Sequence, residues 1–290
     1  MNLGIVLNRV SFEEKQIILA CKELGINVEQ IKNEELFLQL NSEKDPHIKS
    51  DIILQRSLSA VRAVYSTAIL ETKGYKVINN YNTISISADK LLTTLLFEKY
   101  KIPNPRTFAG FTAHSVLNSV EKYLKYPMVT KPILGSWGRM VAKIESYNQL
   151  SSIVESKEVM GDLFQKIHYF QEFIDAPQLN PNNPADIRVF YLGGECIAAM
   201  GRFRPEKDFR SNIALGGSAK KLEIDSEMVS ISKKVAEALQ AEMLGVDLMI
   251  TEKGYVCIEA NAVPGFEGIA NATGINIGKQ IAEYIKNKYL

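Results

Sequence analysis

Residues 245–266 read GVDLMITEKGYVCIEANAVPGF, and this stretch decides the fold. Two apolar runs flank a Lys253-Gly254 turn, which is the pattern of an antiparallel hairpin. Asp247 lies in the first run, and Glu259 and Asn261 end the second run. Because side chains two residues apart in a strand share a face, the last two point the same way. The short turn then brings Asp247 beside them.

This group of polar residues predicts a magnesium site. Two carboxylates and an amide oxygen are hard ligands, and Mg²⁺ takes few protein ligands together with substrate phosphates. Carboxylates buried in apolar strands without a cation are costly. Asp247 alone is more simply explained as a strand-end residue in water or as the partner of an arginine. Asp247, Glu259 and Asn261 together favour the metal.

The composition narrows the chemistry further. The 290 residues include 34 Lys and Arg against 33 Asp and Glu, so a net charge of +1 favours neither nucleic acid nor an anionic membrane. No apolar run is long enough for a spanning helix, and the start MNLGIVLNRV lacks the features of a signal peptide. Three scattered cysteines and three scattered histidines predict a cytoplasmic protein without a zinc site or a Ser–His or Cys–His unit. Carboxylates, lysines and arginines must therefore carry any chemistry.

The pattern of the chain changes near residue 84. Before it, apolar strands such as Leu3–Leu7 alternate with helical segments such as Phe12–Leu24, which predicts a small parallel α/β sheet. After it, a helix that we expect Ser87 to cap is followed by hairpins, one of them at Gly193-Gly194, in α+β style. A long helix is expected over Ser226–Met243. The predicted division is 1–84, 85–170 and 171–290.

A second motif, KPILGSWGRM at Lys131–Met140, combines a strand-end lysine with a Gly-x-x-Gly loop. Glycine-loop amides can hold phosphate oxygens, and Lys131 and Arg139 would add positive charge. The loop is not a Walker sequence, and Gly-x-x-Gly alone is more often a hairpin turn. Downstream, Gln171 or Glu172 could accept a hydrogen bond from an adenine amino group, although the segment alone is only an edge strand.

Basic residues gather in one stretch, residues 202–221. Six lysines and arginines against two acidic residues leave an excess of +4 there, while the whole chain carries +1. Arg188 and Arg202 fall in or at the ends of apolar strands, where arginines pair with carboxylates or bind phosphate. Lys90 begins a helix, where the dipole disfavours a cation unless an anion is near.

In this order the motifs resemble the ATP-grasp carboxylate–amine ligases of the RimK-like branch. The resemblance covers nearly the whole chain and is carried by Lys90, Lys131-Pro132 with GSWGRM, QEFI, DIRVF, GRFR, FRSNIALGG, GVDL and EANAVPGF. Within the branch, the sequence is most similar to the LysX and ArgX type, which loads an amino acid onto an amino-group carrier protein in lysine and arginine biosynthesis. It implies an ATP-grasp fold in two lobes behind a pre-ATP-grasp domain, ATP with two Mg²⁺ ions, and a homo-oligomer.

The resemblance also implies roles for residues. The lysines would bind ATP phosphates under the 135–141 loop, the 171–174 segment would hold adenine, and Asp175 the ribose. Arg188 and Arg202 would stabilise the transferring phosphoryl group or the tetrahedral oxyanion. The implied nucleotide-binding residues are Lys90, Lys131, Gly135, Ser136, Trp137, Gly138, Arg139, Met140, Val141, Gln171, Glu172, Phe173, Ile174, Asp175 and Asn212. The implied substrate-binding residues are Arg202, Asn212, Ile213, Ala214, Pro264, Gly265, Phe266, Glu267 and Gly268.

The implied reaction activates a carboxylate. ATP would phosphorylate the side-chain carboxylate of a carrier protein's C-terminal Glu, and the α-amino group of a free amino acid would attack the acyl phosphate. The Gly265-Phe266 pair resembles the glutamate type, and Phe266 could fill the space that the extra methylene of 2-aminoadipate needs. One methylene is worth about 1–3 kcal/mol. An acidic carrier, LysW in this family, would dock on the basic stretch.

Three alternatives stay open at this point. The amino acid could be 2-aminoadipate. The acceptor could be another protein's C-terminus, as in RimK-type glutamate addition, or a small molecule in a dipeptide ligase. The chain could also bind nucleotide without catalysis, although the presence of all three metal-site residues argues against that.

Overall fold

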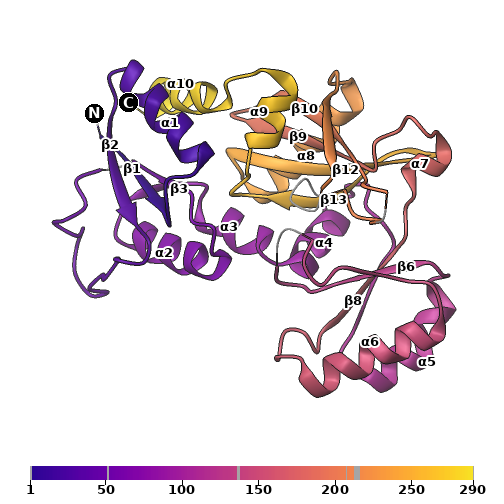
Figure 1. Cartoon of the computed structure of the whole chain (residues 1–290). Helices are drawn as coiled ribbons and strands as arrows, with labels where there is room; N and C mark the ends of the chain where they lie inside the picture. Colours follow the sequence, from indigo (N-terminus) through magenta and orange to yellow (C-terminus); the bar gives the residue numbers. More distant parts are fainter. Residues whose placement is uncertain (1, 51, 136–137, 207, 212–215, 290) are drawn as a thin grey trace.

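The computed structural model describes residues 2–50, 52–135, 138–206, 208–211 and 216–289. Within these ranges the chain forms three sheets, one parallel and two antiparallel, and Figure 1 shows them side by side in three parts. None of the described helices has the length and apolar character that crossing a bilayer requires. The mixture of a parallel α/β domain with two antiparallel lobes confirms the predicted fold class.

The N-terminal domain is a parallel sheet in the order β2-β1-β3-β4. Its register pairs Leu3 of the central strand with Val28 on one side and Ile52 on the other. The alternation of strands and helices predicts this arrangement, because parallel neighbours need a crossover between them. The elements are β1 (Asn2–Leu7), α1 (Phe12–Glu23), β2 (Asn27–Lys32), β3 (Ile52–Gln55), α2 (Ala60–Thr72) and β4 (Lys76–Ile78).

The first lobe is an antiparallel sheet in the order β5-β8-β6-β7, and α5 and α6 pack against it. Because β8 pairs with both β5 and β6, the predicted division at residue 170 would cut this strand, and the lobe's sheet extends to Glu172. The elements are β5 (Thr107–Gly110), α5 (Ala113–Tyr123), β6 (Met128–Lys131), β7 (Ala142–Ile144), α6 (Tyr147–Met160) and β8 (His168–Glu172).

Two helices, α3 (Tyr81–Ser87) and α4 (Lys90–Lys99), connect the N-terminal domain to this lobe. The predicted cap at Ser87 is wrong, because Ser87 ends α3. Asp89 caps α4 instead, and its carboxylate accepts from the amides of Leu91 and Leu92 at 2.8 and 3.0 Å. A carboxylate satisfies these free amides and complements the positive helix end better than a serine further back.

The second lobe is an antiparallel sheet in the order β11-β10-β9-β12-β13, and it contains both predicted hairpins. The predicted helix to Met243 is too long: α8 ends at Leu239, and Gln240 turns left-handed, with φ of 56°, before β12 starts. The elements are α7 (Ala176–Leu179), β9 (Asp186–Leu192), β10 (Glu195–Phe203), β11 (Ser218–Lys221), α8 (Ser226–Leu239), β12 (Met243–Thr251), β13 (Gly254–Asn261), α9 (Glu267–Thr273) and α10 (Ile277–Tyr289).

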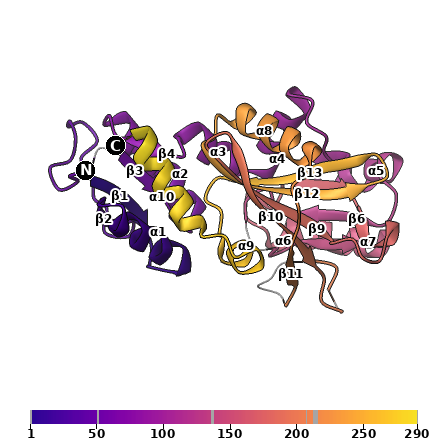
Figure 2. The ribbon, with the colours of Figure 1, turned by 90° about the horizontal axis from the view of Figure 1, so that it is seen from above.

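The last helix returns to the N-terminal domain, where α10 lies beside α1 (Figures 1 and 2). Gly278 permits this approach, because a Cβ there would stand 2.7 Å from the Gln16 backbone. One hydrophobic core joins Ile17 of α1 and Ile281 of α10 to Phe190 of the second lobe. The N-terminal domain and the second lobe therefore share apolar packing.

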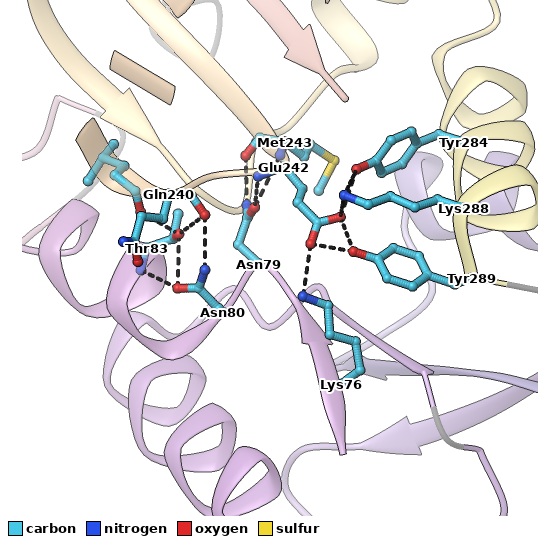
Figure 3. A network of polar contacts seen from close by, with 11 residues as sticks. Lys76, Asn79, Asn80, Thr83, Gln240, Glu242, Met243, Tyr284, Lys288 and Tyr289 are labelled. Atoms are coloured by element: carbon cyan, nitrogen blue, oxygen red, sulfur yellow. Dashed lines mark hydrogen bonds and ion pairs between the residues drawn. The ribbon is translucent and has the colours of Figure 1, made fainter. Parts of the chain in front are cut away.

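Polar contacts join the same two parts on the side shown in Figure 3. The buried Asn79 amide donates to the carbonyls of Met243 and Ala262 at 2.6 and 2.8 Å and accepts from the amides of Glu242 and Met243. Glu242 accepts from two tyrosines of α10 and pairs with Lys76 at 3.0 Å. We call Lys76, Asn79, Glu242, Tyr284, Lys288 and Tyr289 the junction network.

Candidate active site

A cavity of about 1080 Å³ lies where the N-terminal domain and the two lobes meet. The first lobe lines it with Lys131 and the end of β8, and the second lobe lines it with β9, β10 and the β12–β13 hairpin. The N-terminal domain contributes Glu13 and residues 57–61. Most of the described residues that the sequence singles out face this one space.

The hairpin formed by β12 and β13 lines the cavity. Its register sets Asp247 opposite Glu259 and Gly245 opposite Asn261, so the predicted neighbourhood of the three polar residues is confirmed. The register shifts between Asp247 and Leu248, a bulge that re-aims the strand beside the site. Asp247, Glu259 and Asn261 all line the cavity.

A cluster of four charged side chains lies across β9, β10 and β12. The register places Arg188 opposite Asp247 and Arg202 opposite Asp186. The Nε and Nη2 atoms of Arg188 each lie 2.6 Å from an Asp247 oxygen. Arg202 bonds to Asp186 and reaches Asp247 Oδ2 with its Nη2 at 2.9 Å. We call Asp186, Arg188, Arg202 and Asp247 the cavity cluster.

Two members of the cavity cluster, Asp247 and Arg202, are kept charged by their ion-pair partners. Burial alone would raise the pKa of Asp247, but Arg188 and Arg202 hold it below its usual value. Burial alone would lower the pKa of Arg202, but Asp186 and Asp247 raise it. Because each ion is paired and each side chain is at most 15% exposed, removing one member leaves an uncompensated buried charge.

The donor set fits a magnesium ion only in part. Glu259 and Asn261 offer a carboxylate and an amide oxygen from one strand face toward the cavity. Both oxygens of Asp247 are already bound by guanidinium groups, so this carboxylate becomes a ligand only when an arginine gives way. Within the described ranges, no three His, Cys, Asp or Glu side chains converge as a metal site. Mg²⁺, when bound, would neutralise phosphate charge.

Two lysines face the cavity from different elements. Lys90, the first residue of α4, lies 3.4 Å from Glu259 and donates to the Gly135 carbonyl at 2.6 Å. The carboxylate and the carbonyl explain how a cation is tolerated at a helix N-terminus. Lys131, at the end of β6, donates to Gln171 Oε1 at 2.7 Å, and burial lowers its pKa to about 8.

The described residues of the glycine loop, 132–135 and 138–141, lie between the antiparallel strands β6 and β7, as in a hairpin, and several of them line the cavity. Gly135 and Gly138 have φ of 144° and 67°, values that favour glycine. Arg210, from the basic stretch, donates to the Gly138 carbonyl at 2.8 Å. Gly135, Gly138, Arg139 and Val141 line the cavity. Met140 is exposed, and its sulfur accepts from Gln165.

The 171–174 segment lines the far end of the cavity, but its polar side chains are already bound. Gln171 accepts from Lys131 and donates to Thr107 at 3.0 Å. Both oxygens of Glu172 bind Arg106, one to its amide and one to its side chain. An adenine ring would therefore form its hydrogen bonds with the backbone groups of this segment. Phe173 and Ile174 line the same end, whereas Asp175 pairs with Arg204 at 2.7 Å.

Residues 264–268, which the resemblance links to the choice of amino acid, do not all lie where we expect them. Gly265, Glu267 and Gly268 line the cavity, but Phe266 is 1% exposed and packs edge-to-face on Phe12 and Phe190. Phe266 is therefore a core residue, and the idea that its ring fills the space of a methylene in the pocket is wrong. Pro264 is also buried. Ser136, Trp137, Asn212, Ile213 and Ala214 lie outside the described residues.

Sequence reasoning overlooked several cavity residues. Asp186 and Ser211 are buried and hydrogen-bonded to each other, and Asp186 anchors Arg202. Asp186 lies two residues before Arg188 in an apolar strand, and this pairing of an acid with a base is a sequence signal that could have identified Asp186. Glu13 and residues 57–61 come from a domain whose motifs carry no chemical signature, so only the fold reveals them.

A small parallel domain is followed by two antiparallel lobes, which enclose a cavity lined by lysines, arginines and carboxylates. This arrangement defines the ATP-grasp class of enzyme. Solved structures share this architecture over nearly the whole chain. A RimK-domain ATP-grasp protein of Sphaerobacter thermophilus matches with a TM-score of 0.77 at 18% identity, covering 99% of this chain and 100% of that one. D-alanine–D-alanine ligase of Bacillus anthracis, complexed with ATP, matches with a TM-score of 0.70 at 18% identity, covering 99% and 96%.

The chain belongs to the RimK-like ATP-grasp family. The model of the RimK-like ATP-grasp domain matches residues 87–285, and that of the LysX preATP-grasp domain matches residues 3–86. The chain is 32% identical to a glutamate–LysW ligase, ArgX, of Sulfolobus acidocaldarius over 100% of both chains. It is 33% identical to an α-aminoadipate–LysW ligase, LysX, of Saccharolobus solfataricus, covering 95% of this chain and 98% of that one. Family and fold make it an ATP-dependent, ADP-forming carboxylate–amine ligase that uses ATP with Mg²⁺.

Proposed function

We propose that this enzyme couples free glutamate, through its α-amino group, to the side-chain carboxylate of the C-terminal Glu of an acidic carrier protein of the LysW type. The observation that carries the proposal is end-to-end similarity to two LysW ligases, and a cavity lined by lysines, arginines and carboxylates supports it. These relatives use different amino acids, and the Gly265-Phe266 pair is our reason for favouring glutamate over 2-aminoadipate.

The proposed chemistry has two steps. The carrier carboxylate takes the γ-phosphoryl group of ATP, and ADP is released from that bond. The neutral amino nitrogen then attacks the acyl carbon, phosphate leaves, and the nitrogen gives up one proton and keeps the other as the amide N–H. Phosphoryl transfer is catalysed mainly by positioning and charge neutralisation, which Lys90, Lys131 and the glycine-loop amides would supply.

In this scheme the arginines of the cavity cluster act on negative charge that develops during the reaction. Arg188 and Arg202 present rigid, permanently charged donors to the cavity. Glu259, Asn261 and, after release of an arginine, Asp247 would hold Mg²⁺, in our proposal as two ions. Excluding water from the cavity would protect the acyl phosphate from hydrolysis.

A basic surface on the second lobe supports the choice of an acidic partner. Lys220 and Lys221 lie exposed on β11, an edge strand of the second lobe. Complementary charge on a partner mainly raises the rate of association and makes it sensitive to salt. Reversing both charges to Glu should raise the KM for the carrier and flatten its salt dependence. An unchanged salt dependence would argue against this docking surface.

The decisive experiment measures ADP release with a LysW-type carrier and either glutamate or 2-aminoadipate. We expect faster release with glutamate, and mass spectrometry should show the carrier heavier by one dehydrated glutamate. Preference for 2-aminoadipate would correct the substrate. Release with glutamate and a different C-terminal peptide, but not with the carrier, would favour RimK-type addition. ATP binding without ADP release under all conditions would indicate a non-catalytic protein.

A further inference from the structure

The backbone that leaves the metal-site strand is held by side chains of the N-terminal domain. Arg56 donates from Nη1 to the Pro264 carbonyl at 2.8 Å. Glu13 Oε1 accepts from the amides of Phe266 and Glu267 at 3.0 and 3.2 Å. Three backbone groups within four residues are thus bound by charged groups some 200 to 250 residues away in the sequence.

These charged groups are themselves fixed. The Arg56 side chain is 1% exposed, and its Nε lies 3.0 Å from Glu14 Oε1, whose carboxylate also caps α1. Glu13 Oε2 accepts from the Ser11 hydroxyl at 2.8 Å. Burial alone would raise the pKa of Glu13, but Ser11 and the two loop amides lower it, so the carboxylate stays ionised at neutral pH. We call Glu13 and Arg56 the loop clamp.

The sequence of the loop suits this clamp. A Cβ on Gly265 would stand 3.3 Å from Glu13 Oε1, so a larger residue would press on the carboxylate. The Phe266 ring packs under the Arg56 guanidinium at 5.8 Å, besides its contacts in the core. Gly265 and Phe266, the pair that resembles the glutamate type, therefore both lie against the loop clamp.

The clamped loop forms one wall of the cavity, where Gly265, Glu267 and Gly268 are exposed to the space. Glu13 lines the same region, but both of its oxygens are bound to the protein, so it acts on a ligand through the loop. A displacement of about 1 Å in such a wall can cost about 100-fold in rate. The position of this backbone thus sets the shape of that part of the cavity wall.

We propose that Glu13 and Arg56 are positioning residues that fix the 264–267 backbone and thereby set the affinity and selectivity for the free amino acid. The inference rests on the proposed function, because it assumes that this wall receives the amino acid. It assigns the N-terminal domain a part in substrate choice, and it makes Phe266 an anchor of the loop.

The main test replaces Glu13 by Ala and by Gln. Glu13→Ala removes the acceptor of both amides, and we expect the KM for the amino acid to rise about tenfold. The KM for ATP should change less than twofold, and the ratio of kcat/KM for glutamate to that for 2-aminoadipate should fall at least threefold. Glu13→Gln keeps one acceptor oxygen and should recover most of the loss. Equal changes in both KM values, or none, would overturn the proposal.

Glu29 provides a matched control in the same domain. Its carboxylate also accepts from two amides, those of Lys49 and Ser50, and from the Ser50 hydroxyl at 2.7 Å, but it lies outside the cavity lining. Glu29→Ala should leave both KM values within twofold. If Glu29→Ala shifts the amino-acid KM as Glu13→Ala does, the effect is general destabilisation and the clamp plays no specific part.

Arg56 needs a gentler substitution, because its removal would leave Glu14 buried and unpaired. Arg56→Lys keeps the charge near Glu14 and loses the forked reach to the Pro264 carbonyl, so we expect about a threefold rise in the amino-acid KM alone. Wild-type enzyme is measured in parallel. Absence of ADP release by the wild type would refute the proposed function, whereas normal wild-type turnover with unaltered Glu13 and Arg56 variants refutes only the clamp.

Discussion

Strand β12 belongs to two polar regions that differ in what their groups face. At its start, Met243 and the preceding Glu242 join the junction network of Figure 3, in which Asn79 has backbone partners on both sides of its amide. Further along, Asp247 joins the cavity cluster, in which two arginines pair with two carboxylates and face a large cavity. One strand therefore takes part both in the contact between the N-terminal domain and the second lobe and in the candidate active site.

The difference lies in whether a polar group can exchange its partner. The backbone carbonyls and amides that bind Asn79 meet a side chain that is fully buried in a packed core, so breaking those bonds costs stability. The arginines that bind Asp247 border the cavity, where the proposed mechanism brings a phosphate or carboxylate to them, so we expect changes there to alter the chemistry. We expect mutations in the two regions to separate cleanly into losses of activity and losses of stability.

The sharpest test of that separation is Glu259→Ala, next to the cavity cluster. Glu259 lies 3.4 Å from Lys90 with a side chain that is 30% exposed, so its removal leaves no deeply buried charge. We expect ADP release to fall about 1,000-fold while the melting temperature stays within about 2 °C. Glu252→Ala, at the exposed turn of the same hairpin, should keep full activity. Normal turnover by the Glu259 variant would remove Glu259 from the metal site.

The opposite result is expected for Asn79→Ala in the junction network. Loss of the amide leaves buried carbonyls and amides of Glu242, Met243 and Ala262 without a partner. The free energy of unfolding should fall by about 3 kcal/mol, measured by urea denaturation. Activity of the folded enzyme at low temperature should be retained, and the exposed Asn148→Ala should change neither quantity. A stable but inactive Asn79 variant would erase the distinction between the two regions.

Much of the cavity region could be predicted from the sequence, whereas the junction network could not. The hairpin register of Asp247 and Glu259 follows from a short turn and a period of two, which are local properties. The parallel sheet follows from the alternation of strands and helices in the same way. Lys90 at the start of α4 was predicted together with its need for an anion, although the wrong residue was chosen as the cap.

What could not be predicted depends on contacts between distant segments. Asn79, Glu242 and the tyrosines of α10 are unremarkable until the last helix packs on the first, because nothing local requires that return. Phe266 was misplaced for the same reason: its partners Phe12 and Phe190 come from two other parts of the chain. Spacing locates residues on one element, whereas partners across elements are decided by tertiary packing.

In the cavity, a smaller effect is expected on how nucleotide binding depends on pH. Burial lowers the pKa of Lys131 to about 8, so its ammonium group is lost as the pH rises through that value. Phosphate binding favours the charged form, so the Kd for ADP should rise above pH 8, by at most about tenfold per pH unit. Lys131→Arg stays charged and should flatten this rise, whereas the exposed Lys125→Arg should not. Titration calorimetry between pH 6.5 and 9.5 would measure it, and a flat wild-type profile would contradict it.

The smallest expected effect lies in the junction network, at Glu242. Burial alone would raise the pKa of Glu242, but Tyr289, Tyr284 and Lys76 lower it below the ordinary 4.5. A carboxyl whose pKa is lowered by folding adds stability above its unfolded pKa, and this contribution is lost as the pH falls through the folded value. Glu242→Gln should therefore reduce the free energy of unfolding by about 1 kcal/mol at pH 7 and by progressively less below pH 4.5. Activity should not change, since the network lies outside the cavity lining. Urea denaturation between pH 3 and 7 would measure the difference in free energy of unfolding between wild type and variant, with the exposed Glu237→Gln as control. A difference that does not change with pH would show that the charge of Glu242 contributes nothing to the stability of the junction network.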